Sequence, residues 1–340
     1  MSVVIVHSAA VLNKNESKIL ENGTRGAKMA LKEILMKWSL KIKNSRYVPE
    51  SLKLKIFIYR EKKFLDGIRK EQKGLEIGPS HSPVVPKKEG YHVETVDWLD
   101  QAGLREHYKN DHVNLDTIEP VDYVWKGGSY SQLIQKSNYY DYIIASHMIE
   151  HTTNFAGFLQ DCSNLLKKDG ILRLAVPDKR YCFDHYRYTT SIAEVLNNAC
   201  MPNDLQSVGN VAEYYMNVVQ RKGQISWNKP ALSVFDFLMK HRYRDYRFIH
   251  GKGLIMDEMR RACENQYIDI HHYVFTPASF ELLIYDLRVL EVIDMKITHM
   301  WNTRRNEFIV TLQKTAEKEE LDISYRQQLL RARDKQNTIF

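Results

Sequence analysis

The sequence has few cysteines and no long apolar run, and each of these absences rules out a class of protein. Its four cysteines are scattered over 340 residues without CxxC spacing. We interpret them as reduced thiols and expect neither a disulfide framework nor a cysteine-ligated zinc site. No apolar segment approaches the roughly 20 residues that span a bilayer. The N-terminal apolar patch has no basic residues before it, which predicts no signal peptide and a cytoplasmic protein.

The chain also lacks an acidic surplus, since its formal net charge is +7. A positive balance attracts nucleic acid, anionic lipid surfaces or phosphorylated substrates. The basic residues are spread along the chain, which favours a solvated basic surface over a dedicated binding site. Residues 242–248, RYRDYRF, are the one cluster that combines basic and aromatic side chains.

Glycine is scarce where a dinucleotide-binding turn needs it. Residues 74–83, GLEIGPSHSP, have the pattern of a buried strand that ends in a tight turn. A dinucleotide site uses G-x-G-x-x-G so that a pyrophosphate can approach a helix N-terminus, but here only Gly78 follows the strand. Pro79 and Pro83 lack backbone donors, and His81 would crowd a pyrophosphate. The turn therefore excludes NAD and favours a cofactor without phosphates.

Alternating strand and helix patterns surround this turn. The predicted strands cover residues 75–77, 91–96, 121–125, 142–145 and 171–176, and the predicted helices cover 53–71, 102–108 and 155–167. Strands that alternate with helices predict an α/β fold with a doubly wound, mostly parallel sheet. Ligands bind such sheets at the carboxyl ends of the strands.

The alternation stops after residue 177. We predict an N-terminal extension at 1–50 (partly helical, with a helix over 26–42), a cofactor-binding core at 51–180 and an inserted acceptor or lid region at 181–272. Residues 273–314 would complete the sheet with a helix that Thr276 caps and strands at 290–297 and 307–312. The last two strands predict an antiparallel hairpin at the sheet edge, and 315–340 a charged surface tail.

Three residues at the predicted strand ends indicate which kind of cofactor the site binds. Glu76 would repel a phosphate and suits a cationic ligand or an amine. Asp97 ends the second strand and could accept hydrogen bonds from both hydroxyls of a ribose, and Trp98 beside it could cover an adenine. A cationic sulfonium that carries an adenosine without phosphates satisfies these requirements, and that molecule is S-adenosylmethionine.

Four segments in order resemble a known family. They are LEIGPSHSP at 75–83, IASHMIEH at 144–151, LAVPDKRYCFD at 174–184 and HHYVFTPASF at 271–280. Together they resemble class I S-adenosylmethionine-dependent methyltransferases, and more narrowly a bacterial group associated with surface-polysaccharide biosynthesis. The resemblance covers about residues 74–314, is weak in 190–265 and is absent from the first 50.

This resemblance implies a Rossmann-like seven-stranded sheet and a sugar or glycan acceptor, with other glycan-biosynthesis enzymes as partners. The family tends to place an acid after the third strand to meet the adenine amine, whereas this chain has Lys126 there, so we expect backbone groups near Trp125 and Gly127 to serve instead. The expected cofactor-binding residues are Glu76, Gly78, Pro79, Ser80, Asp97, Trp98, Trp125, Gly127, Ser146 and His147.

HMIEH at 147–151 matches H-x-x-E-H, the spacing of a metalloprotease family. On a helix, His147 and His151 would share one face, as zinc ligation requires. The motif follows directly on a buried strand and no third ligand is apparent, so we expect no metal site and interpret His151 as structural.

The catalytic candidates are His147, Asp178 and His272. A neutral histidine with a pKa near 6.5 suits a general base, and His147 lies where the fourth strand opens into the cleft; the alternative is that it orients the loop or contacts the cofactor. Asp178 could bind a sugar hydroxyl or simply pair with the basic residues that follow it. His271 and His272, with Asp269 in the segment DIHH at 269–272, could reach the cleft or serve in packing.

The sequence leaves three functions open. The main prediction is a sugar or glycan O-methyltransferase. Four aromatic residues either stack on the sugar ring or pack in the hydrophobic core: Tyr181, Phe183, Tyr186 and Tyr188. A catalytically inactive binding module in a glycan-biosynthesis complex is the alternative. Nucleic-acid methylation is disfavoured because SHMIEH stands after the fourth strand in place of an N/D-PP-Y segment.

Overall fold

The computed structural model describes residues 60, 62–111, 113–201, 204–227 and 245–338. The chain divides into two units, Met1–Glu61 and Lys62–Phe340, and the features below lie in the second. The predictions for residues 1–50, for the first part of the helix over 53–71 and for residues 242–244 of the basic and aromatic cluster fall outside the described residues. Within the described part of the chain, no helix is both long and apolar enough to cross a membrane.

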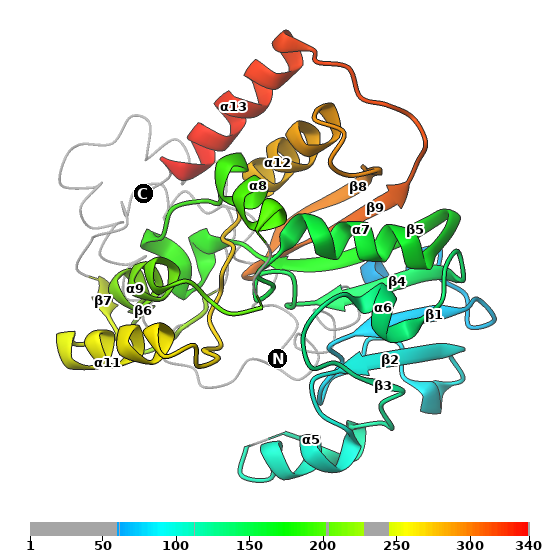
Figure 1. Ribbon diagram of the computed structural model, residues 1–340, viewed down its shortest axis with the longest axis horizontal. Helices are drawn as coiled ribbons and strands as arrows, with labels where there is room; N and C mark the ends of the chain where they lie inside the picture. The colour runs from blue at the N-terminus through cyan, green and yellow to red at the C-terminus, as the bar shows by residue number, and fades with distance from the viewer. Residues whose placement is uncertain (1–59, 61, 112, 202–203, 228–244, 339–340) are drawn as a thin grey trace, which may run out of the picture. The chain divides into compact units, whose positions relative to one another are not determined.

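A seven-stranded sheet organises the second unit, with the strands side by side in the order β3-β2-β1-β4-β5-β9-β8 (Figure 1). The strands are β1 (Gly74–Ile77), β2 (Val93–Asp97), β3 (Tyr123–Val124), β4 (Tyr140–Ser146), β5 (Leu166–Pro177), β8 (Met295–Arg304) and β9 (Glu307–Lys314). β1 to β5 pair in parallel, whereas β9 is antiparallel to β5 and to β8. The predicted mostly parallel sheet with a C-terminal antiparallel hairpin is confirmed.

The strand order reverses between β1 and β4, which lie next to each other in the centre of the sheet. From β1 the chain winds outward to β2 and β3, and from β4 it winds the other way to β5. At such a reversal the loops after the two strands diverge and leave a crevice, where ligands bind in open α/β sheets. The loops that follow Ile77 and Ser146 therefore border the natural ligand site.

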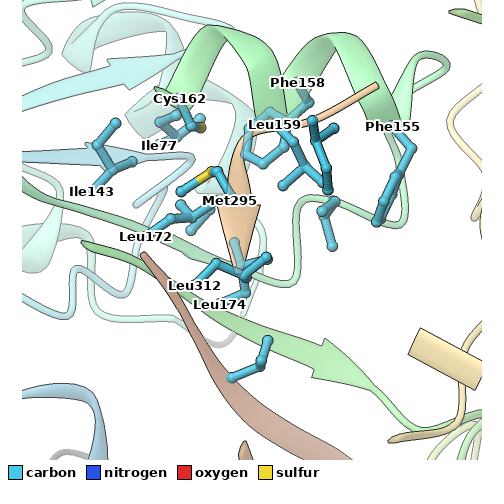
Figure 2. Close-up of a cluster of buried hydrophobic side chains, with 14 of the residues drawn as sticks. Ile77, Ile143, Phe155, Phe158, Leu159, Cys162, Leu172, Leu174, Met295 and Leu312 are labelled. Carbon is cyan, nitrogen blue, oxygen red and sulfur yellow. The ribbon is translucent and has the colours of Figure 1, made fainter. Parts of the chain in front are cut away.

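Both faces of the sheet are buried, as parallel strands require. Along β4, Ile143 and Ala145 belong to one hydrophobic cluster, whereas Tyr142 and Ile144 belong to a second one on the opposite face. Figure 2 shows side chains of helix α7 (Phe155–Leu165) that point toward the strands, among them Phe158 and Leu159. This apolar layer holds the loop between β4 and α7 in place.

The other helices are α5 (Gln101–Tyr108), α6 (Tyr130–Ile134), α8 (Ile192–Cys200), α9 (Val208–Asn217), α11 (Lys252–Cys263), α12 (Pro277–Val289) and α13 (Ile323–Asn337). Thr276 caps α12 as predicted, in a reciprocal capping box with Ser279. α13 packs on α12, with Leu329 buried between Leu282 and Tyr285.

Several predicted boundaries are wrong; the strand predicted over 171–176, for example, begins at Leu166. Three further errors have a clear physical cause. Residues 65–73 form turns and not the end of a helix over 53–71. The helix predicted over 155–167 stops at Leu165, because Leu166 already pairs with Tyr140 in the sheet. The strand predicted over 290–297 begins only at Met295, because α12 continues to Val289 and the chain then turns through a left-handed residue, Glu291 (φ 54°).

The region between β5 and α12 has a small core of its own, formed by α9, α11 and the segment after α11; its buried residues are Val211, Ala262, Ile268 and Ile270. It also contains the short 3-10 segments η3 (Lys179–Tyr181) and η4 (Phe183–Tyr186) and an antiparallel pair, β6 (Val219–Arg221) with β7 (Tyr246–Phe248). The chain then returns to the sheet, where the Lys179 amide donates to the Phe275 carbonyl (2.9 Å). This return brings residues 269–275 beside the loop that follows β4, since the His272 amide donates to the Glu150 carbonyl (2.7 Å).

Candidate functional site

The turn after β1 is built to leave open space at the strand end. Gly78 has a left-handed backbone (φ 70°), which favours glycine, and Ser80 is also left-handed (φ 51°). A Cβ on Gly78 would lie 3.5 Å from Met148 of the β4 loop. The Ser80 hydroxyl meets that of Tyr108 on α5 (2.8 Å), which fixes the turn. Pro79 lies within the turn between these two residues.

Asp97, at the end of β2, is buried (4% exposed). The Ser80 amide donates to Oδ2 and the Trp98 amide donates to Oδ1, each at 2.8 Å. Burial raises the pKa of Asp97, and the two backbone hydrogen bonds oppose that rise. Each carboxylate oxygen keeps a further lone pair, so the residue can still accept from two neighbouring hydroxyl groups.

Glu76 is a buried carboxylate with a different task. It is 2% exposed, and it accepts from the amides of Val84 (2.7 Å) and Val85 (3.2 Å). These bonds fold the chain back after the turn and close the β1 loop. The sequence predicted contact with a cationic ligand. The backbone partners favour a role in holding the loop, and the ligand contact stays a prediction.

Two tryptophans border the same edge of the sheet. The Trp125 amide donates to the Asp97 carbonyl (2.8 Å), and its indole ring stacks on Tyr130 with 5.4 Å between centroids. Trp98 is 45% exposed, and Lys126 donates to its carbonyl at 3.0 Å. The Lys126 side chain is thus held at this rim, in the place where the family tends to have an acid.

An acid that sequence reasoning missed lies at this rim. The Gly128 amide donates to Oδ1 of Asp204 at 3.3 Å. Gly127 has φ 112°, and a Cβ there would lie 3.0 Å from Oδ2 of Asp204. Asp204 belongs to the region between β5 and α12, and the only sequence signal for it is its position in the predicted acceptor or lid region.

His147 follows Ser146 at the end of β4 and has a left-handed backbone (φ 52°). Its Nε2 lies 2.7 Å from Glu307 on β9, and its Nδ1 lies 3.4 Å from Glu150. Burial lowers the pKa of His147, but the two carboxylates outweigh that effect and raise it to about 10. At neutral pH the ring is a cation, so it is not the neutral general base that the sequence suggested.

Residues 147–151 form a turn and not a helix. His147 and His151 therefore do not share a helix face, and the metalloprotease geometry considered for H-x-x-E-H is absent from this segment. The segment places Glu150 and His151 beside residues 269–272 instead.

Asp178 is fully buried at the end of β5. Its carboxylate accepts from the Arg180 guanidinium (2.8 Å to Nε) and from the Thr303 hydroxyl (2.5 Å). With no exposed surface and with both oxygens occupied, it holds the loop after β5. The structure contradicts the predicted contact between Asp178 and a sugar hydroxyl.

His272 is also enclosed, at 4% exposure. Its ring meets the side chains of Asn198 (2.9 Å) and Gln206 (2.6 Å). Burial, together with the nearby Arg187 cation, lowers the pKa of His272 to about 4. The ring is neutral and turned into the polar interior of the region between β5 and α12, so the structure gives it a packing role and not a catalytic one.

The four aromatic residues that could stack on a sugar ring do not share one surface. They are Tyr181, Phe183, Tyr186 and Tyr188. The Phe183 ring lies 4.6 Å from that of His271, whereas Tyr186 packs against Tyr246 (5.5 Å). Tyr188 is 85% exposed, and the Arg180 guanidinium lies over Tyr181. Of the four, Phe183 is the one that contacts a residue beside the β4 loop.

Residues 50–217 match the model of a family described as a methyltransferase domain, a stretch that contains the ends of β1, β2, β4 and β5. The sequence matches no curated protein. Among solved structures, it is similar to a candidate S-adenosylmethionine-dependent methyltransferase from Listeria monocytogenes (12% identity, 76% of this chain and 96% of that chain, TM-score 0.38). A SAM-dependent methyltransferase from Methanosarcina mazei (13% identity, 74% and 95%, TM-score 0.36) is similar as well.

A candidate zinc-dependent alcohol dehydrogenase from Rhodobacter sphaeroides is about as similar (12% identity, 75% of this chain and 89% of that chain, TM-score 0.37). At these identities and TM-scores a structural likeness does not distinguish one chemistry from another. Among the comparisons, the match of residues 50–217 to the methyltransferase-domain model is the finding that bears on the function.

Proposed function

We propose that this S-adenosylmethionine-dependent methyltransferase transfers its methyl group to a hydroxyl group of a sugar or glycan intermediate. The methyl donor follows from the methyltransferase domain over residues 50–217. The position proposed for the methyl donor depends chiefly on Asp97, whose buried carboxylate accepts from two backbone amides at the end of β2.

In this proposal the adenosine lies along the ends of β1, β2 and β3. Asp97 accepts from the two ribose hydroxyls, and the Gly78–Pro79–Ser80 turn passes close to the methionine part because Gly78 carries no side chain. Trp98 and Trp125 border the adenine. Asp204, next to Gly127 and Gly128, accepts from the adenine amine and thereby replaces the acid that is missing after β3.

The acceptor is proposed to bind beyond the end of β4. There the turn at 147–151 meets the region between β5 and α12, and the side chains that meet are histidines and carboxylates, with Phe183 beside them. Such groups offer hydrogen bonds to hydroxyls on several sides, which suits a sugar better than a flat apolar acceptor. The Tyr186, Tyr188 and Asp178 side chains are not part of this proposed site.

Methyl transfer is an in-line displacement at carbon: the hydroxyl oxygen forms the new C–O bond as the C–S bond breaks, and the hydroxyl proton passes to water or to a carboxylate at the site. The chief contribution of the protein is to align the acceptor oxygen with the methyl group. His147 is about one-third exposed (37% of its side chain), and its two ring nitrogens face Glu307 and Glu150. As an imidazolium it is proposed to orient these two carboxylates beside the acceptor.

The experiment is methyl transfer from methyl-labelled S-adenosylmethionine to nucleotide sugars, glycan extracts and RNA, with the label located by mass spectrometry. We expect the label on a sugar oxygen, and no transfer by a matched Asp97→Ala variant. Label on RNA or on nitrogen would contradict the proposed acceptor. Cofactor binding without transfer to any acceptor would favour the alternative, an inactive binding module in a glycan-biosynthesis complex.

A further inference from the structure

Three potential metal ligands meet beside the end of β4, and none of them has a place in the proposed methyl-donor site. They are Glu150 and His151 from the turn after β4 and His271 from the segment before α12. One ligand atom from each lies within 4.8 Å of the other two. The backbone fixes this meeting, because the amides of His272 and Tyr273 both donate to the Glu150 carbonyl, at 2.7 and 3.1 Å.

Each of the two histidines is oriented by a carboxylate of its own. Nδ1 of His151 lies 2.8 Å from Asp269, and Nδ1 of His271 lies 2.6 Å from Asp184. Asp184 is in turn held by Arg187 at 2.9 Å. These contacts leave the Nε2 atom of each imidazole available for a cation. A carboxylate behind a histidine is the usual second layer of a protein metal site, where it fixes the ring and makes it more basic.

Glu150 supplies an independent indication of a ligand. Its side chain has no exposed surface, and among the described residues neither of its carboxylate oxygens makes a hydrogen bond. The nearest polar atoms are Nδ1 of His147 at 3.4 Å and Nε2 of His271 at 3.9 Å. The His147 imidazolium offsets part of this buried charge, but a buried carboxylate also needs hydrogen bonds or a ligand for its oxygens, and those oxygens have neither among the described residues.

We propose that Glu150, His151 and His271 bind a divalent transition-metal cation, for which Zn²⁺ is the best match. Two imidazole nitrogens and one carboxylate oxygen are donors that Zn²⁺ accepts, and three protein ligands leave a fourth position open. Tetrahedral ligands at about 2.0–2.2 Å from zinc lie roughly 3.4 Å apart, so the three side chains must close in by about 1 Å.

The site differs from the metal arrangement that H-x-x-E-H suggests in the sequence. The glutamate is a ligand, the third ligand comes from 120 residues further along the chain, and His147 is not a ligand. This proposal departs from the sequence-based expectation of no metal site, which nothing yet tests. The side chain of His151 is 33% exposed, so the open position faces solvent and can take water or a hydroxyl oxygen. This inference does not depend on the identity of the methyl acceptor.

The first test is metal binding by the full chain after treatment with a chelator. Calorimetric titration with Zn²⁺ should give one ion per chain with a dissociation constant in the micromolar range or below, and bound Zn²⁺ should raise the unfolding temperature. Glu150→Gln and His271→Gln should each weaken binding at least 100-fold. Asp269→Asn, which removes the carboxylate behind His151, should weaken it about 10- to 100-fold.

His250→Gln is the matched control, because His250 is a partly exposed histidine outside the cluster, and this variant should bind Zn²⁺ as the wild type does. A wild-type chain that binds no Zn²⁺ at one equivalent would overturn the proposal, as would variants that fold and bind Zn²⁺ unchanged.

X-ray absorption spectroscopy on the zinc-loaded wild type identifies the metal ligands directly, so it tests the proposal even if a variant fails to fold. Two imidazole nitrogens and a carboxylate oxygen are expected around the metal. A sulfur ligand, or histidine ligands without a carboxylate, would contradict the assignment.

Discussion

At the scale of single residues, the site contains two buried carboxylates on neighbouring strands with opposite roles. Glu76 accepts from two amides of its own loop, whereas Asp97 accepts from the Ser80 amide of the β1 turn and from the Trp98 amide, and so lies between two loops. The sequence identified both as strand-end acids. It could not separate them, because the difference lies in which backbone amides reach each carboxylate.

Glu76→Gln should therefore affect folding more than cofactor binding. The amide keeps one acceptor oxygen but cannot accept from both Val84 and Val85, and one buried donor is left unpaired. We expect a loss of about 1–3 kcal/mol in the free energy of unfolding, measured by urea denaturation, and an affinity for S-adenosylmethionine within threefold of wild type. If the variant were as stable as wild type but no longer bound S-adenosylmethionine, Glu76 would contact the cofactor, as the sequence predicted.

Asp204→Asn tests whether Asp204 contacts the adenine amine in place of the acid that is expected after β3. If Asp204 accepts from the adenine amine, the variant should bind S-adenosylmethionine about 5- to 10-fold more weakly, in line with one lost charge-assisted hydrogen bond. An analogue without the 6-amino group should bind wild type and variant equally. Lys126→Met, at the same rim, is the control and should leave the preference for the amine intact. Equal binding of S-adenosylmethionine by Asp204→Asn and wild type would refute the contact.

At the scale of elements, the alternation of strand and helix patterns predicted the sheet, and the errors lie at element ends. The apolar run 290–297 looked like a strand, yet α12 ends at Val289, Glu291 after it is left-handed, and the Val292 amide donates back to the Leu287 carbonyl (2.9 Å). This is the Schellman type of helix end, usually marked by a glycine. Glu291 gives no such signal, so the start of β8 could not be located from the sequence.

Glu94 links β2 to β4 and gives a pH-dependent test of the sheet. It accepts from Lys136 (2.6 Å) and from the hydroxyls of Tyr123 and Tyr140. Burial raises the pKa of Glu94, but Lys136 and Tyr140 outweigh it and lower the pKa below its ordinary value of 4.5. The stabilisation is thus complete above pH 4.5 and is lost as the pH falls through the lower folded-state pKa.

Glu94→Gln should cost about 1 kcal/mol of unfolding free energy at pH 7. The difference from wild type should shrink as the pH falls below 4.5, when measured by urea denaturation at a series of pH values. Glu89→Gln, at an exposed glutamate, is the control and should match wild type throughout. A Glu94→Gln deficit that stays constant down to pH 3 would contradict the ionic origin.

At the scale of the whole molecule, the site combines segments that are far apart in the sequence. Asp204 reaches Gly128, His271 reaches Glu150 and Glu307 reaches His147. The motifs located the segments after β1, β2, β4 and β5, because each lies at a strand end. Asp204 lies in no motif, and the segment 269–272, although its sequence predicts that it could reach the cleft, does not show which strand end it meets.

Arg187 holds this region together. Its buried guanidinium binds Asp184 and Glu213 and donates to the His271 carbonyl (2.7 Å). Arg187→Met should lower the unfolding free energy by about 3–5 kcal/mol, because Asp184 would lose a buried ionic partner. Arg260→Met removes an exposed ion pair and should change it by less than about 1 kcal/mol. Similar losses in both variants, by urea denaturation, would refute the role of Arg187.

The most direct test of the account is a calorimetric titration of wild type and Asp97→Ala with S-adenosylmethionine. The central claim is that the buried carboxylate at the end of β2 holds the ribose of the methyl donor. The account predicts one cofactor per chain for wild type and at least a 30-fold loss of affinity for Asp97→Ala, with its unfolding temperature recorded to show that it is folded. Unchanged affinity in a folded Asp97→Ala variant would contradict the account.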